Sequence, residues 1–140
     1  MSKKQTFQED LIIRGIKIID IAYITCLYVI PTLYVAKILD FYVYPYLTPY
    51  KNIPEKDKTH IQLIAELLIY LSINGILAYI LRNILQAIPF PFEGVYGFQH
   101  LRVKEVSSGQ LIALVLIWFS NTIRDKMLLL HNKMNEIFKK

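Results

Sequence analysis

Charged side chains are absent from three stretches of this 140-residue chain, and each stretch is almost entirely apolar. The stretches cover residues 21–36, 67–81 and 106–123. A helix needs about 20 apolar residues to cross the hydrocarbon core of a bilayer, and flanking apolar residues extend all three stretches toward that length. A soluble domain spaces charges through its helices, whereas here the charges cluster between the stretches. The sequence therefore predicts an integral membrane protein with three transmembrane helices.

Cysteine is also nearly absent, since Cys26 is the only one and lies inside the first apolar stretch. One cysteine excludes an intrachain disulfide, and in an apolar helix a thiol behaves as a small hydrophobic group. The composition is 54% hydrophobic and 19% charged, which departs from soluble usage toward that of membrane proteins. A soluble bundle of unusually apolar helices is the alternative.

The sequence also lacks the motifs typical of enzymes and of cofactor- or metal-binding proteins. The chain has no phosphate-binding loop, no G-x-G-x-x-G and no G-x-S-x-G. Its three histidines fall in separate segments without the spacing of a metal site. The net charge of +5 comes from basic residues spread over both termini and the loops, not from one basic face. We therefore expect no enzyme activity, no cofactor, no metal and no nucleic-acid partner. Basic residues that flank spans instead suit anionic lipid head groups.

The pattern predicts one all-α membrane domain over residues 1–140, with spans near 18–39, 61–82 and 106–123. Thr59-x-x-Gln62 forms a capping box, which predicts the start of the second helix. Between the first two spans, residues 41–50 read FYVYPYLTPY. The two prolines oppose a regular helix, and tyrosine favours the membrane–water boundary. This segment is predicted to be an aromatic interface loop, presented by Tyr42, Tyr44, Tyr46 and Tyr50.

The C-terminal part contains no helix breaker between residues 98 and 106, which favours one long helix from Phe98 to Phe138. The alternative is a shorter helix capped by Ser107-x-x-Gln110. Residues 123–138 are amphipathic, with a narrow apolar stripe at spacings of four and three. The stripe predicts a docking surface for a partner helix in a hetero-oligomeric assembly. Its members are Ile123, Met127, Leu130, Met134 and Ile137.

The second span carries polar residues four apart, on one helix face: Gln62, Glu66, Tyr70 and Asn74. An ionisable residue inside a span is a functional hypothesis by default, so Glu66 is a candidate proton or cation site. The alternative is that the stripe joins helices through hydrogen bonds, with Glu66 protonated or paired to Lys37, Arg82 or a neighbouring chain. The second interpretation is favoured.

The segment PFEGVYGFQHLRVKE, residues 91–105, is followed by a single apolar stretch. This arrangement resembles a motif in uncharacterised small membrane proteins of giant (nucleocytoplasmic large) DNA viruses, with Pro91, Phe92, Gly94, Gly97 and Phe98 as the matching positions. A composition rich in Ile, Lys, Asn and Tyr suits the AT-rich genomes of such viruses. The resemblance implies an inner-membrane protein of the virion that contacts the capsid, and it implies no catalytic residue.

These observations together predict a structural or assembly protein that lies in the virion internal membrane and anchors a larger complex. The first alternative is an accessory subunit of a respiratory-type complex in an organellar inner membrane. The second alternative, from another class, is a small oligomeric ion channel that uses Glu66.

Overall fold

A computed structural model describes residues 7–103 and 109–139, and every regular element within those ranges is helical. The predicted all-α class is therefore confirmed. The longer helices are α1 (Phe7–Ile38), α3 (His60–Gln86), α5 (Gln110–Phe119) and α6 (Asn121–Phe138). After α1 come the π-helical turn η1 (Leu39–Val43) and the short helix α2 (Tyr44–Leu47). Three single 3-10 turns lie in the connections: η2 (Glu55–Asp57), η3 (Val95–Gly97) and η4 (His100–Arg102).

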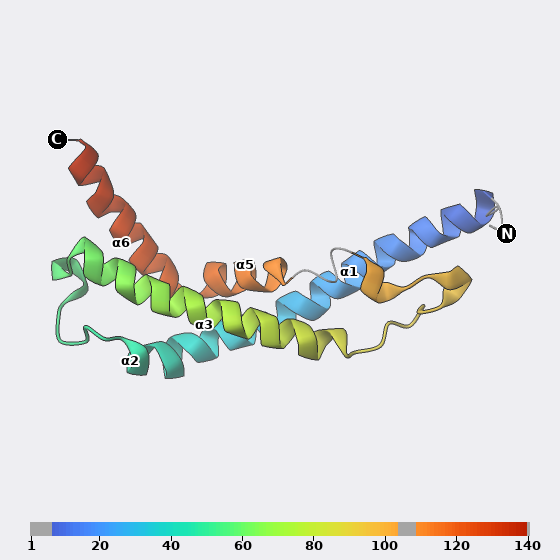
Figure 1. Cartoon of the computed structure of the whole chain (residues 1–140), viewed down its shortest axis with the longest axis horizontal. Helices are drawn as coiled ribbons and strands as arrows, with labels where there is room; N and C mark the ends of the chain where they lie inside the picture. Colours follow the sequence, from blue (N-terminus) through green and yellow to red (C-terminus); the bar gives the residue numbers. More distant parts are fainter. Residues whose placement is uncertain (1–6, 104–108, 140) are drawn as a thin grey trace.

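The molecule is elongated, and the chain passes along its long axis three times (Figure 1). Helices α1 and α3 run in opposite directions, and α5 packs against both of them, parallel to α1. Helix α6 packs against α3 and leaves the axis at the end far from the start of α1. The two connections that flank α3 therefore lie at opposite ends of the molecule.

Two segments, Phe7–Leu47 and His60–Gln86, are long and apolar enough to cross a membrane. Helix α1 alone, with 32 residues, is about 48 Å long, and α3, with 27, is about 40 Å. Helix α5 has only 10 residues, so it reaches about 15 Å, half of a hydrocarbon core. The structure thus contains two helices of spanning length and a shorter apolar one.

The tyrosine-rich segment is helical over residues 41–47, so the predicted loop over residues 41–50 is wrong there. In η1 the Tyr44 N–H bonds to the carbonyl of Leu39, one residue further back than in an α-helix. The widened turn places Pro45 in the first turn of α2, where a missing N–H costs little. Tyr42 and Tyr46 are exposed and Tyr50 is half-buried, but Tyr44 is buried and so is not part of an aromatic surface loop.

The single helix predicted from Phe98 to Phe138 is also wrong. Phe98 and Gln99 have extended backbones, and α5 begins only at Gln110. A second break occurs at Ser120, whose extended backbone (ψ 113°) separates α5 from α6. The alternative start at Ser107 lies outside the described residues, although Gln110 is indeed the first residue of α5.

Contacts from the end of α1 hold the break between α5 and α6. The Lys37 ammonium donates a hydrogen bond to the Phe119 carbonyl, at the C-terminal end of α5 (3.1 Å). The Asp40 carboxylate accepts from the Ser120 hydroxyl (2.6 Å) and from the Asn121 N–H (2.8 Å), at the start of α6. A cation therefore faces the negative end of one helix dipole and an anion faces the positive end of the next. These two side chains, three residues apart, set the angle at which α6 departs.

Replacing Asp40 should loosen α6. In Asp40→Ala the Ser120 hydroxyl and the first N–H groups of α6 lose their acceptor, at a cost of about 1 kcal/mol in the free energy of unfolding. Thermal unfolding in detergent, followed by circular dichroism, measures the loss. Asp57→Ala removes an exposed carboxylate elsewhere and serves as the control. Equal unfolding midpoints for the two variants would contradict the role given to Asp40.

Candidate functional site

The polar stripe of α3 faces the interior of the molecule. Helix α3 begins with the predicted capping box, since the Gln62 N–H donates to the Thr59 hydroxyl (3.4 Å) and the Thr59 N–H to the Gln62 side chain (3.0 Å). The next three members of the stripe, Glu66, Tyr70 and Asn74, are buried. Gln62 thus belongs to the helix cap, and the other three make contacts between helices.

Glu66 forms ion pairs with two lysines that the sequence did not indicate. The Lys58 ammonium lies 2.9 Å from Oε1 and 3.0 Å from Oε2 of Glu66, and the Lys126 ammonium also donates to Oε2. Neither predicted partner, Lys37 or Arg82, is bonded to Glu66. Lys37 donates instead to the Phe119 carbonyl at the end of α5. Lys58 instead precedes the cap of α3, and Lys126 reaches across from α6.

A second carboxylate closes the cluster. Glu55, in η2, accepts from Lys58 (2.7 Å) and from Lys126 (2.7 and 2.8 Å). Two carboxylates and two ammonium groups therefore alternate, and no charge in the cluster lacks an opposite neighbour. The side chains of Glu66, Lys58 and Lys126 are 0%, 1% and 6% exposed, whereas Glu55 is 52% exposed. Of the four charged side chains, Glu55 is therefore the one with substantial access to water.

The same contacts keep Glu55 and Lys58 in their charged forms. Burial alone would raise the pKa of Glu55, but hydrogen bonds from Lys126 and Lys58 outweigh it and hold that pKa below its usual value. Burial alone would lower the pKa of Lys58, but hydrogen bonds from Glu55 and Glu66 outweigh it and raise that pKa. Each group is stabilised in its charged form, so both are ionised at neutral pH.

A polar and aromatic layer continues from the cluster along α3. The Lys126 ammonium lies 5.7 Å from the centre of the Tyr70 ring, within the range of a cation–π contact. The Tyr70 and Thr48 hydroxyls are 2.6 Å apart, and the Tyr44 hydroxyl donates to the Asn74 side chain (2.7 Å). Each buried member of the stripe therefore bonds to another element, which is the joining role that the sequence favoured.

Sequence reasoning missed a second buried pair at the other end of the molecule. Asp20 of α1 lies 2.6 Å from Nδ1 of His100, and both side chains are buried. The His100 ring stacks on Phe90 (5.1 Å), and its backbone N–H donates to Glu93 (2.8 Å). No spacing pattern in the sequence connects these two residues, which are 80 positions apart. The pair attaches the connection after α3 to α1.

The apolar stripe of α6 is buried in part and exposed in part. Ile123 is fully buried and Leu130 packs against the core, so this chain itself covers that part. Met127, Met134 and Ile137 are 41%, 43% and 55% exposed. The buried face of α6 carries Lys126, which the stripe did not include. The end of α6 beyond Leu130 is therefore the part that remains available to a partner.

No protein-family model, curated protein or solved structure matches this chain. The resemblance to giant-virus membrane proteins therefore stays a prediction. In residues 7–103 and 109–139, no group of three His, Cys, Asp or Glu side chains is placed to hold a metal ion. Fold and cluster together define an all-helical protein with two helices of spanning length and buried ion pairs at one end.

Removing the charge of Glu66 should be severely destabilising. In Glu66→Gln, two buried ammonium groups would share one half-exposed carboxylate, and leaving such a charge uncompensated costs about 3–5 kcal/mol. The unfolding midpoint in detergent measures this loss, with Glu136→Gln, at an exposed position of α6, as the control. Adding Lys126→Met to Glu66→Gln should recover part of it. If Glu66→Gln alone unfolded at the same midpoint as Glu136→Gln, the cluster would not hold the fold together.

Proposed function

We propose that the protein is a non-enzymatic membrane anchor. Its long helices fix it in a bilayer, and the exposed end of α6 binds another protein of a larger assembly. The observation that carries the proposal is the distribution of side chains: large apolar groups are exposed along the long helices, while polar and charged groups of the same helices are buried.

Few of the apolar side chains of the two long helices are fully buried, and many large ones are exposed. Only 22% of the most apolar window in the segment Phe7–Leu47 and 33% of that in α3 is buried, whereas a core helix of a soluble protein is mostly buried. Polar residues of the same helices, such as Thr32 and Asn74, are buried. Lipid removes the cost of exposing apolar groups, and it favours burying polar ones between helices. Exposed apolar residues include Ile30, Tyr34, Leu68, Ile76 and Tyr79 of the two long helices, and Leu114 and Trp118 of α5.

The arrangement of the helices supports three crossings rather than two. Helices α1, α3 and α5 alternate in direction, and the two ends of the chain lie at opposite ends of the long axis (Figure 1). We therefore propose residues 106–123 as the third span, with α5 as its described core. Helix α1 is longer than a hydrocarbon core, so its first turns extend beyond the bilayer.

The contacts of Glu66 favour a structural role over ion conduction. Both of its oxygens accept hydrogen bonds from lysine ammonium groups. A carboxylate that relays a proton or a cation needs an oxygen open to a water-filled path. A channel is therefore the weaker candidate.

The particular assembly is proposed from the resemblance of residues 91–105 to giant-virus membrane proteins. In that form of the proposal, the protein lies in the internal membrane of a virion and contacts the capsid. The alternative is an accessory subunit of a respiratory-type complex in an organelle. Both require the same anchor and differ only in the partner bound by α6.

Labelling of single cysteines should place the two ends of the chain on opposite sides of the membrane. In a Cys26→Ser background, Ser2→Cys and Lys140→Cys would be treated with an impermeant thiol reagent in sealed vesicles. One should react before permeabilisation and the other only after it. Asn52→Cys, in the connection between α2 and α3, should behave like Lys140→Cys. Reaction of both end positions from the same side would rule out three spans.

A charge at the exposed end of α6 should release the partner without affecting insertion. Ile137→Glu places a carboxylate on the apolar face, and Asn132→Glu places one at another exposed position as the control. Crosslinking in the native membrane, followed by identification of the products, measures the contact. Crosslinks to capsid proteins that disappear only in Ile137→Glu are expected. Crosslinks to respiratory subunits would favour the alternative assembly, and unchanged crosslinks would show that α6 does not dock through this face.

A further inference from the structure

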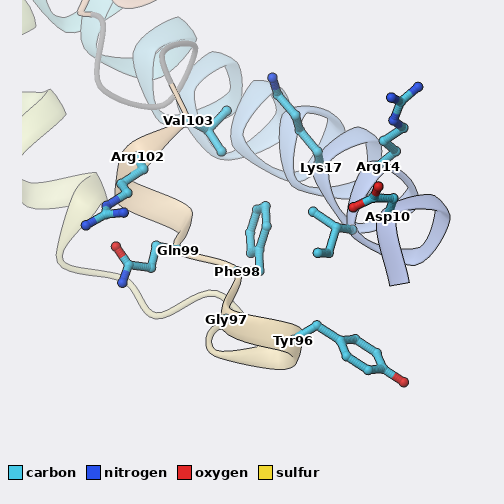
Figure 2. Close-up of a pocket in the computed structure, with 10 residues that line it drawn as sticks. Asp10, Arg14, Lys17, Tyr96, Gly97, Phe98, Gln99, Arg102 and Val103 are labelled. Carbon is cyan, nitrogen blue, oxygen red and sulfur yellow. The ribbon is translucent and has the colours of Figure 1, made fainter. Parts of the chain in front are cut away.

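A cleft of about 720 Å³ lies between the first turns of α1 and the segment that contains η3 and η4 (Figure 2). Arg14 and Lys17 line it from α1, and Tyr96, Phe98 and Arg102 line it from the other side. The proposed anchoring role makes no use of this cleft. It lies at the end of the molecule opposite the ion-pair cluster (Figure 1).

The lining of the cleft is cationic. It contains Arg14, Lys17 and Arg102, against the single carboxylate of Asp10. Within the described part of the chain, no carboxylate lies within ion-pair distance of any of these three cations. The cluster around Glu66 differs in this respect, because its cations are neutralised by the protein itself. The cleft therefore carries positive charge that an anionic ligand would complete.

The backbone beside the cleft is strained at one tyrosine. Tyr96 has a φ of 50°, a left-handed conformation that side chains other than glycine seldom adopt. Gly94 and Gly97 on either side are also left-handed, and the turn is closed by a bond from the Gly94 N–H to the Phe98 carbonyl (2.9 Å). Such strain concentrates at ligand-binding sites. Here it keeps the Tyr96 ring at the edge of the cleft, half exposed.

The shape of the cleft suits an extended anion rather than a compact one. Phe98 lies between α1 and the turn, while Lys17 and Arg14 extend from the helix and Arg102 lies on the far side (Figure 2). In this view the ends of Lys17 and Arg14 extend away from Phe98, so the three cations are spread apart and do not meet at one point. A ligand would need an anionic group together with an apolar part that packs against Phe98.

The position of the cleft identifies such a ligand. The lining residues of α1 immediately precede residue 18, where the first span is predicted to begin. Leu11, Ile18 and Leu101, near the cleft in sequence, are 63%, 69% and 58% exposed. If α1 crosses a bilayer as proposed above, on which this inference rests, the cleft lies at the membrane–water boundary. Basic pockets at that level bind the head groups of anionic lipids.

We propose that this cleft binds the phosphate-bearing head group of an anionic phospholipid. Arg14, Lys17 and Arg102 neutralise the head group, and Tyr96 and Phe98 pack against the glycerol and the upper acyl chains. The site would fix the depth and the rotation of α1 in the membrane.

Native mass spectrometry of the full chain, purified in detergent with equal amounts of phosphatidylglycerol and phosphatidylcholine, tests the proposal. The wild type should retain phosphatidylglycerol preferentially. Each cation near an anionic lipid contributes about fivefold in affinity, so Arg102→Gln should weaken the preference by about that factor. The combination of Arg14→Gln, Lys17→Gln and Arg102→Gln should abolish it. The control combines Lys51→Gln, Lys56→Gln and Lys139→Gln, which removes the same charge elsewhere.

Two outcomes would overturn the proposal: no preference in the wild type, or an equal preference in the cleft variants and the control. Inorganic phosphate, added as a competitor, should not displace the lipid; displacement would identify a site for free phosphate instead. Insertion into phosphatidylcholine vesicles, measured by resistance to alkaline extraction, is followed in parallel. Normal insertion without lipid preference would reject the cleft alone, whereas failure to insert would reject the membrane anchor.

Discussion

The carboxylate of Glu66 is the constraint from which much of this structure follows. A fully buried anion on an apolar helix has to be neutralised, and the nearest turns of α3 provide no cation. Lys58 is brought in from the connection before α3, and Lys126 from α6. Both lysines are then buried in turn, and Glu55 balances the second positive charge. One buried acid thus determines where a loop folds and where a distant helix packs.

Local patterns were enough to predict the helices but not their interruptions. The apolar stretches and the Thr59–Gln62 capping box identified α3, because both signals lie within a few residues of the structure they specify. The break at Ser120 depends on Asp40, which is 80 residues away, so the uninterrupted pattern from Phe98 to Phe138 was misleading. Pro45 was misinterpreted for a related reason, since a π-helical turn ahead of it made a helical position acceptable.

The candidate site was predicted in part. The spacing of Glu66, Tyr70 and Asn74 correctly placed them on one buried face, because helical periodicity alone fixes that relation. Their partners could not be inferred, since Lys126 and Glu66 are 60 residues apart and the sequence offered Lys37 and Arg82 as partners instead. Asp20 and His100 show the same limit, because only the folded chain brings them into contact.

Glu55 connects helix α6 to the segment that precedes α3. Its carboxylate accepts hydrogen bonds from Lys58, in the connection before α3, and from Lys126, in α6. Lys133 of α6 also donates to the backbone carbonyls of Lys56 and Lys58. A partner that draws α6 away from α3 breaks these contacts and so frees the connection. If that changes the affinity of the connection for a second partner, the second partner changes the affinity of α6 for the first by the same factor. The half-exposed Glu55 is one of the contacts through which the two surfaces are linked.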